Sequence, residues 1–186
     1  MKFFKRPAVA VILTVIIVIC SSLISVNAKL GSRCDRVIDG FYDGVRYNRE
    51  NHPAIADQLQ TLCSVADEMT VIAGNYGIDT AELSDTCSNL RLALRYSTKD
   101  ISYIYAEYIN FLSALRTAEN ALHSTGLSER HMSAMEGYSD TISACVELID
   151  GACYNDTVRD FMRSYDKFPV RGWVEILGIT FPEYFS

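Results

Sequence analysis

One uncharged stretch near the N-terminus constrains this chain more than any other feature. Residues 8–26 contain no charged side chain, and their only hydroxyl groups belong to Thr14, Ser21, Ser22 and Ser25. As a helix, this stretch is about 29 Å long, close to the ~30 Å hydrocarbon core of a bilayer. Pro7 precedes it, at a position where the first turn of a helix tolerates proline. The sequence therefore predicts a helix that enters a membrane.

Residues 1–28 fit two membrane roles, a transmembrane anchor or a cleaved signal peptide. A signal peptide has a basic head, an apolar core of about 7–15 residues and a small-residue cleavage site. Val26-Asn27-Ala28 fits such a site, with cleavage before Lys29. The apolar stretch is longer than that core and long enough to span, which favours a single-pass anchor in the cell membrane. The alternative is a cleaved, secreted protein.

The positive charges on the two sides of the span set its expected orientation. Three precede it (Lys2, Lys5 and Arg6), and three follow closely (Lys29, Arg33 and Arg36). Lysine and arginine accumulate on the cytoplasmic side of membrane helices. The α-amino group adds one positive charge to the N-terminal side, which favours a cytoplasmic N-terminus and an extracytoplasmic domain.

The part of the chain that follows residue 28 is acidic. The first 28 residues hold three of the 17 Lys and Arg residues and none of the 23 Asp and Glu residues. The remainder therefore has 14 positive and 23 negative side chains. Phosphate backbones repel such a surface, so we expect no nucleic-acid partner. The length of this part predicts one domain rather than two.

Five of the six cysteines follow the span, namely Cys34, Cys63, Cys87, Cys145 and Cys153. They form no CxxC pair and no Cys/His ligand spacing, so we expect no zinc site. One interpretation treats them as small buried apolar residues. The other is a disulfide between two helices, for which Cys63 and Cys87 are the first pair to consider.

Apolar residues recur at helical spacing through the rest of the chain. The pattern predicts helices over 29–47, 53–73, 79–123 and 128–167, with Asn51 or His52 capping the second and Pro53 as its first residue. We therefore expect an all-α fold: a transmembrane helix, an antiparallel bundle of about four helices over 29–169, and a short apolar tail over 170–186. The tail is expected to pack on the bundle; the alternative is docking on a membrane or another protein.

The C-terminal part resembles the end of the LemA family. Its signature comprises a Tyr-Asn pair, a valine one turn later, Phe-Pro, and a glycine-containing apolar tail that finishes in Tyr-Phe. The matching residues are Tyr154, Asn155, Val158, Phe168, Pro169, Gly178, Tyr184 and Phe185. The resemblance implies a membrane-anchored antiparallel helical bundle without an established molecular activity. It also implies an N-terminus outside the cell, opposite to the orientation that charge favours.

No catalytic pattern accompanies this architecture. The sequence lacks the G-x-S-x-G, H-E-x-x-H, Walker and dinucleotide-binding glycine motifs. We therefore predict a protein that is not an enzyme, binds no cofactor or metal, and contacts an unidentified protein partner in an interaction or assembly role. The rival is a ligand-binding or enzymatic bundle with a polar interior pocket. For Tyr154 and Asn155, the alternatives are binding of a partner or ligand, and packing where the last helix meets the tail.

Overall fold

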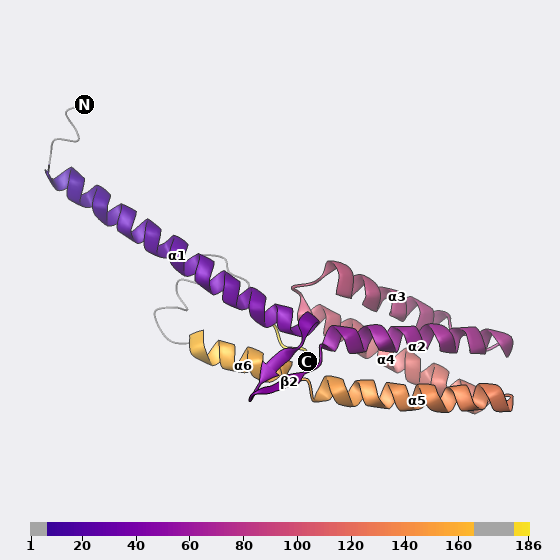
Figure 1. Ribbon diagram of the computed structural model, residues 1–186. Helices are drawn as coiled ribbons and strands as arrows, with labels where there is room; N and C mark the ends of the chain where they lie inside the picture. Colours follow the sequence, from indigo (N-terminus) through magenta and orange to yellow (C-terminus); the bar gives the residue numbers. More distant parts are fainter. Residues whose placement is uncertain (1–6, 166–180) are drawn as a thin grey trace.

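The computed structural model describes residues 7–165 and 181–186 of the chain. Within them the fold is all-α, apart from one short β-hairpin. A long helix projects from one end, and a group of helices lies side by side at the other end (Figure 1). This is the predicted architecture of an N-terminal apolar helix followed by a helical bundle.

Helix α1 (Pro7–Asp43) is a continuous helix of 37 residues with two different surfaces. Apolar side chains of its first half are exposed, among them Ile17 at 62% and Ile24 at 70%. In its second half, Leu30, Val37 and Phe41 are buried against the rest of the protein. One helix therefore carries both the exposed apolar segment and part of the core.

Helix α1 ends where the chain turns into a hairpin of β1 (Val45–Tyr47) and β2 (Glu50–His52). The strands pair antiparallel, with Val45 opposite His52. The prediction of a helix to about residue 47, with Asn51 or His52 as the next cap, was wrong. Gly44 has a φ of 82°, a left-handed conformation that stops the helix. The next helix begins at Ile55, two residues after Pro53.

Gly44 is expected to tolerate no side chain. A Cβ at this position would lie 2.5 Å from the carbonyl oxygen of His52, in a backbone conformation that disfavours alanine. We predict that Gly44→Ala lowers the free energy of unfolding by about 2–3 kcal/mol. The matched control is Gly137→Ala, an open position inside a helix, which is expected to stabilise by up to about 1 kcal/mol. Equal effects of the two substitutions in denaturant melts would contradict this account.

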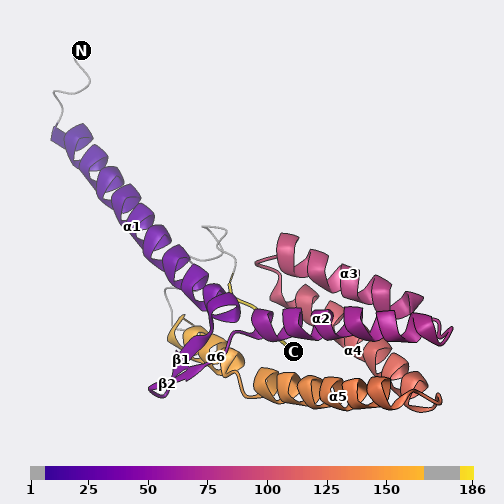
Figure 2. The same ribbon diagram turned by 45° about the vertical axis from the view of Figure 1, so that its right-hand side comes forward.

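The bundle consists of four helices connected by short turns: α2 (Ile55–Asn75), α3 (Ala81–Tyr96), α4 (Ile101–His123) and α5 (Glu129–Asp150). Successive helices run in opposite directions, and the two views agree on their side-by-side arrangement (Figure 2). Helix α3 packs mainly on α4, and α2 packs mainly on α5. A shorter helix, α6 (Tyr154–Tyr165), lies beside the C-terminal end of α1 (Figure 2).

Two of the predicted helices are each divided into two. The helix expected over 79–123 is interrupted between Tyr96 and Ile101, where Asp100 caps α4 by accepting a hydrogen bond from the Tyr103 backbone N–H at 3.0 Å. The helix expected over 128–167 is interrupted between Asp150 and Tyr154, where Cys153 adopts a φ of 56°. Cys145 and Cys153 therefore lie on different segments rather than on one helix.

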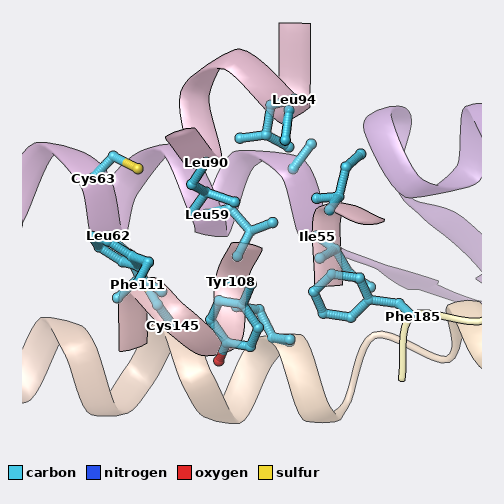
Figure 3. Close-up of a cluster of buried hydrophobic side chains, with 14 of the residues drawn as sticks. Ile55, Leu59, Leu62, Cys63, Leu90, Leu94, Tyr108, Phe111, Cys145 and Phe185 are labelled. Carbon is cyan, nitrogen blue, oxygen red and sulfur yellow. The ribbon is translucent and has the colours of Figure 1, made fainter. Parts of the chain in front are cut away.

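The core is apolar and continuous from the end of α1 to the bundle. Figure 3 shows part of it, with side chains from α2, α3, α4 and α5 meeting Phe185 of the tail. The members labelled there are Ile55, Leu59, Leu62, Cys63, Leu90, Leu94, Tyr108, Phe111, Cys145 and Phe185. Among residues 7–165 and 181–186, no charged residue and no polar residue is buried.

Candidate functional site

The residues of the C-terminal signature meet where α6 begins. The reversal at Cys153 turns the chain out of α5 and places Tyr154 and Asn155 in the first turn of α6. Residues 181–186 run past this turn. Tyr154, Asn155 and residues 181–186 together are called the tail clasp below.

Asn155 holds the backbone of Phe185 from both sides. Its Nδ2 donates to the Phe185 carbonyl oxygen at 2.9 Å, and its Oδ1 accepts from the Phe185 N–H at 2.8 Å. Both backbone groups of one residue are thus satisfied by a single carboxamide. This pairing fixes the position of Phe185 along the chain, because a shift of one residue would break both hydrogen bonds.

Tyr154 adds a second polar contact from a buried position. Its ring is 1% exposed and lies 5.7 Å from that of Phe41, between ring centroids. The Tyr154 hydroxyl donates to the carbonyl oxygen of Glu183 at 3.1 Å. Burial raises the pKa of Tyr154, so the phenol stays protonated and remains a donor.

The Phe185 side chain fills an aromatic cage formed by two helices. Its ring centroid lies 5.4 Å from that of Phe41 on α1, 5.0 Å from that of Tyr105 and 5.6 Å from that of Tyr108 on α4. Such separations and tilted orientations are favourable for aromatic pairs. Phe185 therefore connects the end of α1 with α4.

Glu183 attaches the tail to the start of α4. Its Oε2 accepts a hydrogen bond from the Ser102 backbone N–H at 3.1 Å. Backbone N–H groups in the first helical turn lack partners within the helix, and the helix dipole favours a carboxylate there. The tail clasp thus contacts α1, α4 and α6 at one place.

A cavity of about 450 Å³ adjoins the tail clasp between α4, α5 and α6. Tyr105, Tyr108 and Phe185 line it, together with charged residues that include Arg116 and Asp150. Its volume lies within the range of small-ligand pockets. Among the residues that the structure describes, no group of three or more His, Cys, Asp or Glu residues has an arrangement that could hold a metal ion.

Removal of the Asn155 carboxamide tests the tail clasp. Asn155→Ala leaves the N–H and carbonyl of Phe185 without these partners, so we expect the free energy of unfolding to fall by about 2–3 kcal/mol. Asn110→Ala, at an exposed site on α4, is the control and is expected to change it by less than about 0.5 kcal/mol. Chemical denaturation measures the free energy of unfolding of both variants. Equal losses would show that the Asn155 hydrogen bonds do not stabilise the fold.

The structure brings some of the predicted site residues together and leaves others outside its described parts. Asn155 bonds to Phe185, the neighbouring Tyr154 bonds to Glu183 of the same tail, and Val158 is fully buried on α6. Tyr184 points outward, with 37% exposure. Phe168, Pro169 and Gly178 lie in the segment 166–180, outside the described residues.

Sequence reasoning missed the residues that receive the tail. Phe41, Ser102, Tyr105 and Tyr108 each lie more than 75 positions before the tail residue that they contact. A local signal existed only for the start of α4, where an aspartate at position 100 precedes an apolar run. No residue near the start of α4 indicates that Glu183 binds there.

Two polar clusters lie at other interhelix contacts. The Tyr76 hydroxyl accepts from the Ser128 N–H at 3.0 Å and lies 2.9 Å from Nδ1 of His131. Ser139 on α5 donates to Glu119 on α4. In neither cluster does a histidine accept a proton from a nucleophile while a carboxylate orients it, which is the arrangement that hydrolytic triads need.

Comparisons of the chain with protein-family models, curated proteins and solved structures give no match.

Proposed function

We propose that this chain is a membrane-anchored helical-bundle protein of the LemA family that works through interaction or assembly rather than catalysis. In this proposal α1 crosses the cell membrane once. The bundle lies on the extracytoplasmic side and presents an acidic helical surface to a protein partner. The anchor raises the local concentration of the bundle at the membrane, which strengthens otherwise weak contacts.

The exposed apolar surface of α1 carries the proposal. Val15, Ile16, Ile17, Val18 and Ile19 are consecutive and each is 49–62% exposed. Successive helical residues are about 100° apart, so five of them cover the whole circumference. No other described part of the protein covers this surface. Water is a poor environment for an apolar cylinder, whereas lipid is a good one.

The continuity of α1 favours an anchor over a cleaved signal peptide. The bond before Lys29 lies inside an unbroken helix, and the residue that follows, Leu30, is 3% exposed. Cleavage there would require the helix to open at the edge of the packed core. An uncleaved helix keeps the anchor and the core in one piece.

The interior of the bundle favours interaction over catalysis. Within the described residues the core is apolar and holds no charged side chain. The rival function, a ligand-binding bundle, needs polar groups that converge in a pocket. The cavity beside the tail clasp is the place where such a ligand would bind, but of its charged lining residues Arg116, Asp150 and Arg159 are exposed and Asp156 is half-buried.

The resemblance to the LemA family gains support from contacts between its two ends. Asn155 belongs to the first part of the signature and Phe185 to the last, and the two share a pair of hydrogen bonds. Residues that contact each other across 30 positions act as one structural unit. In this proposal Tyr154, Asn155 and Phe185 of the signature fasten the tail to α6, α4 and α1.

Intact mass and membrane extraction test the proposal together. We expect the mature protein from cells to retain residues 1–28 and to stay in the membrane pellet after alkaline washing. A mature form that begins at Lys29 and is soluble would establish a secreted bundle instead. For the orientation, Leu92→Cys places a thiol at a site that is 54% exposed. Labelling of this thiol in intact cells by an impermeant maleimide is expected, and labelling only after lysis would place the bundle in the cytoplasm.

A further inference from the structure

Two cysteines on neighbouring helices form the most specific chemical arrangement outside the tail clasp. Cys63 on α2 and Cys87 on α3 are 0% and 1% exposed. The Cys87 thiol donates a hydrogen bond to the Cys63 carbonyl oxygen, with 3.7 Å between sulfur and oxygen, so the two residues are in direct contact. Both are free thiols in the structure.

A guanidinium group is fixed beside this pair. Arg91 lies one turn after Cys87 on α3, and its Nη2 donates to the Cys63 carbonyl oxygen at 3.2 Å. The same side chain makes a bidentate contact with Asp67 of α2, at 3.1 and 2.6 Å. Arg91 thus holds α2 and α3 in the register that places the two thiols opposite each other.

The two thiols differ in acidity. The hydrogen bond from Cys63 lowers the pKa of Cys87, and the positive charge of Arg91 lowers it further. The same hydrogen bond and burial raise the pKa of Cys63. By contrast, burial raises the pKa of Cys145, which has no such partner among the described residues. Cys87 is therefore the sulfur that reaches the thiolate state first.

We propose that Cys63 and Cys87 form a redox site that closes into a disulfide between α2 and α3, with Cys87 as the attacking sulfur and a small or protein disulfide as oxidant. The Cys87 thiolate attacks one sulfur of the oxidant, whose disulfide bond breaks as a mixed disulfide forms and one thiolate leaves. Cys63 then loses its proton and attacks the Cys87 sulfur, and the second thiol leaves. The protein loses two protons and two electrons, and the oxidant becomes two thiols.

Access to the pair requires a small opening of the α2–α3 contact, because both thiols are buried. A hollow of about 440 Å³ between the two helices is lined by Gln60, Ser64 and Arg91, and Arg91 separates it from Cys63, to whose carbonyl oxygen it donates. It offers the route along which an oxidant reaches Cys87 when Arg91 moves aside. The closed disulfide would link two helices that are consecutive in the chain and would stabilise the folded bundle.

The test uses the full chain in detergent, incubated with oxidised glutathione. We expect the intact mass to fall by two hydrogen atoms and peptide mapping without reductant to show Cys63 linked to Cys87. The thermal midpoint is expected to rise by about 10 °C and to return after reduction. Recovery of both cysteines as free thiols, alkylated only after denaturation, would overturn the proposal.

Single-cysteine variants identify the attacking sulfur. In Cys63→Ala we expect a mixed disulfide of glutathione to accumulate on Cys87. In Cys87→Ala the reaction at Cys63 is expected to be at least about tenfold slower, because its thiolate is less populated. The control is Cys145→Ala, which is equally buried and should form the disulfide as the wild type does. Equal rates at the two sulfurs, or a stabilised oxidised form of Cys87→Ala, would contradict the assignment.

Discussion

The double substitution Ile16→Arg with Ile19→Arg is expected to release the protein from the membrane. Both residues lie in the middle of the apolar segment and are each 49% exposed. An arginine at the centre of a membrane helix costs about 2.5–3.5 kcal/mol, so two cost about 5–7 kcal/mol. We expect most of the variant in the soluble or aggregated fraction after alkaline washing, while the wild type stays in the pellet.

A matched control separates membrane insertion from a general effect of added charge. Val71→Arg with Leu92→Arg places two arginines at bundle positions that are 70% and 54% exposed. These sites face water in our account, so this variant is expected to remain in the membrane pellet like the wild type. Release of both variants, or of neither, would show that residues 16 and 19 do not face lipid.

Phe185→Ala is expected to destabilise the fold strongly. The ring is 6% exposed and contacts aromatic rings of α1 and α4. Removal of a buried phenylalanine ring typically costs 3–5 kcal/mol, and we expect a loss of about that size. Thermal or denaturant unfolding of the purified protein measures it.

The neighbouring residue supplies the control for this prediction. Tyr184 is 37% exposed and makes none of the cage contacts, so Tyr184→Ala is expected to cost less than about 1 kcal/mol. If both variants unfold like the wild type, the tail is not part of the cooperative core. If both are equally destabilised, the loss does not come from the aromatic cage.

Much of the architecture could be predicted because apolar periodicity is a local signal. Leu59, Leu62 and Met69 recur at threes and fours on α2, and all three are fully buried. The uncharged stretch over 8–26 likewise predicted the exposed half of α1. The places of these helices in the sequence therefore follow from the pattern of their own residues.

The interruptions of the helices could not be predicted in the same way. The apolar pattern lapses only at Ser97 and Thr98 and resumes at Ile101, and a cap at Asp100 competes with helix continuation by only about 1 kcal/mol. What decides the outcome is the packing of α3 against α4 over their full length, which no local window contains. The break at Cys153, with a φ of 56°, likewise lies inside a stretch whose apolar pattern predicts one helix.

The hairpin after α1 had a partial signal. Asn48 and Arg49 form its two-residue turn with φ values of 51° and 72°. Asparagine is typical of such a turn, but arginine stands where glycine is usual. The helix predicted over 29–47 ends just before this turn. The pair of hydrogen bonds between Asn155 and Phe185 had no local signal, since the two residues are 30 positions apart.

In the proposed arrangement, α1 is one helix that crosses a bilayer and continues into the core. Spin labels placed singly from residue 13 to residue 41, in protein reconstituted into vesicles, test it most directly. We predict high accessibility to oxygen on every face up to about residue 25. Beyond residue 29 we predict that the accessibility of the labels varies with the period of a helix. Positions 30, 37 and 41 are expected to be protected from both oxygen and water-soluble reagents. Accessibility of residues 13–25 to the water-soluble reagent, or loss of the helical period between residues 26 and 30, would contradict it.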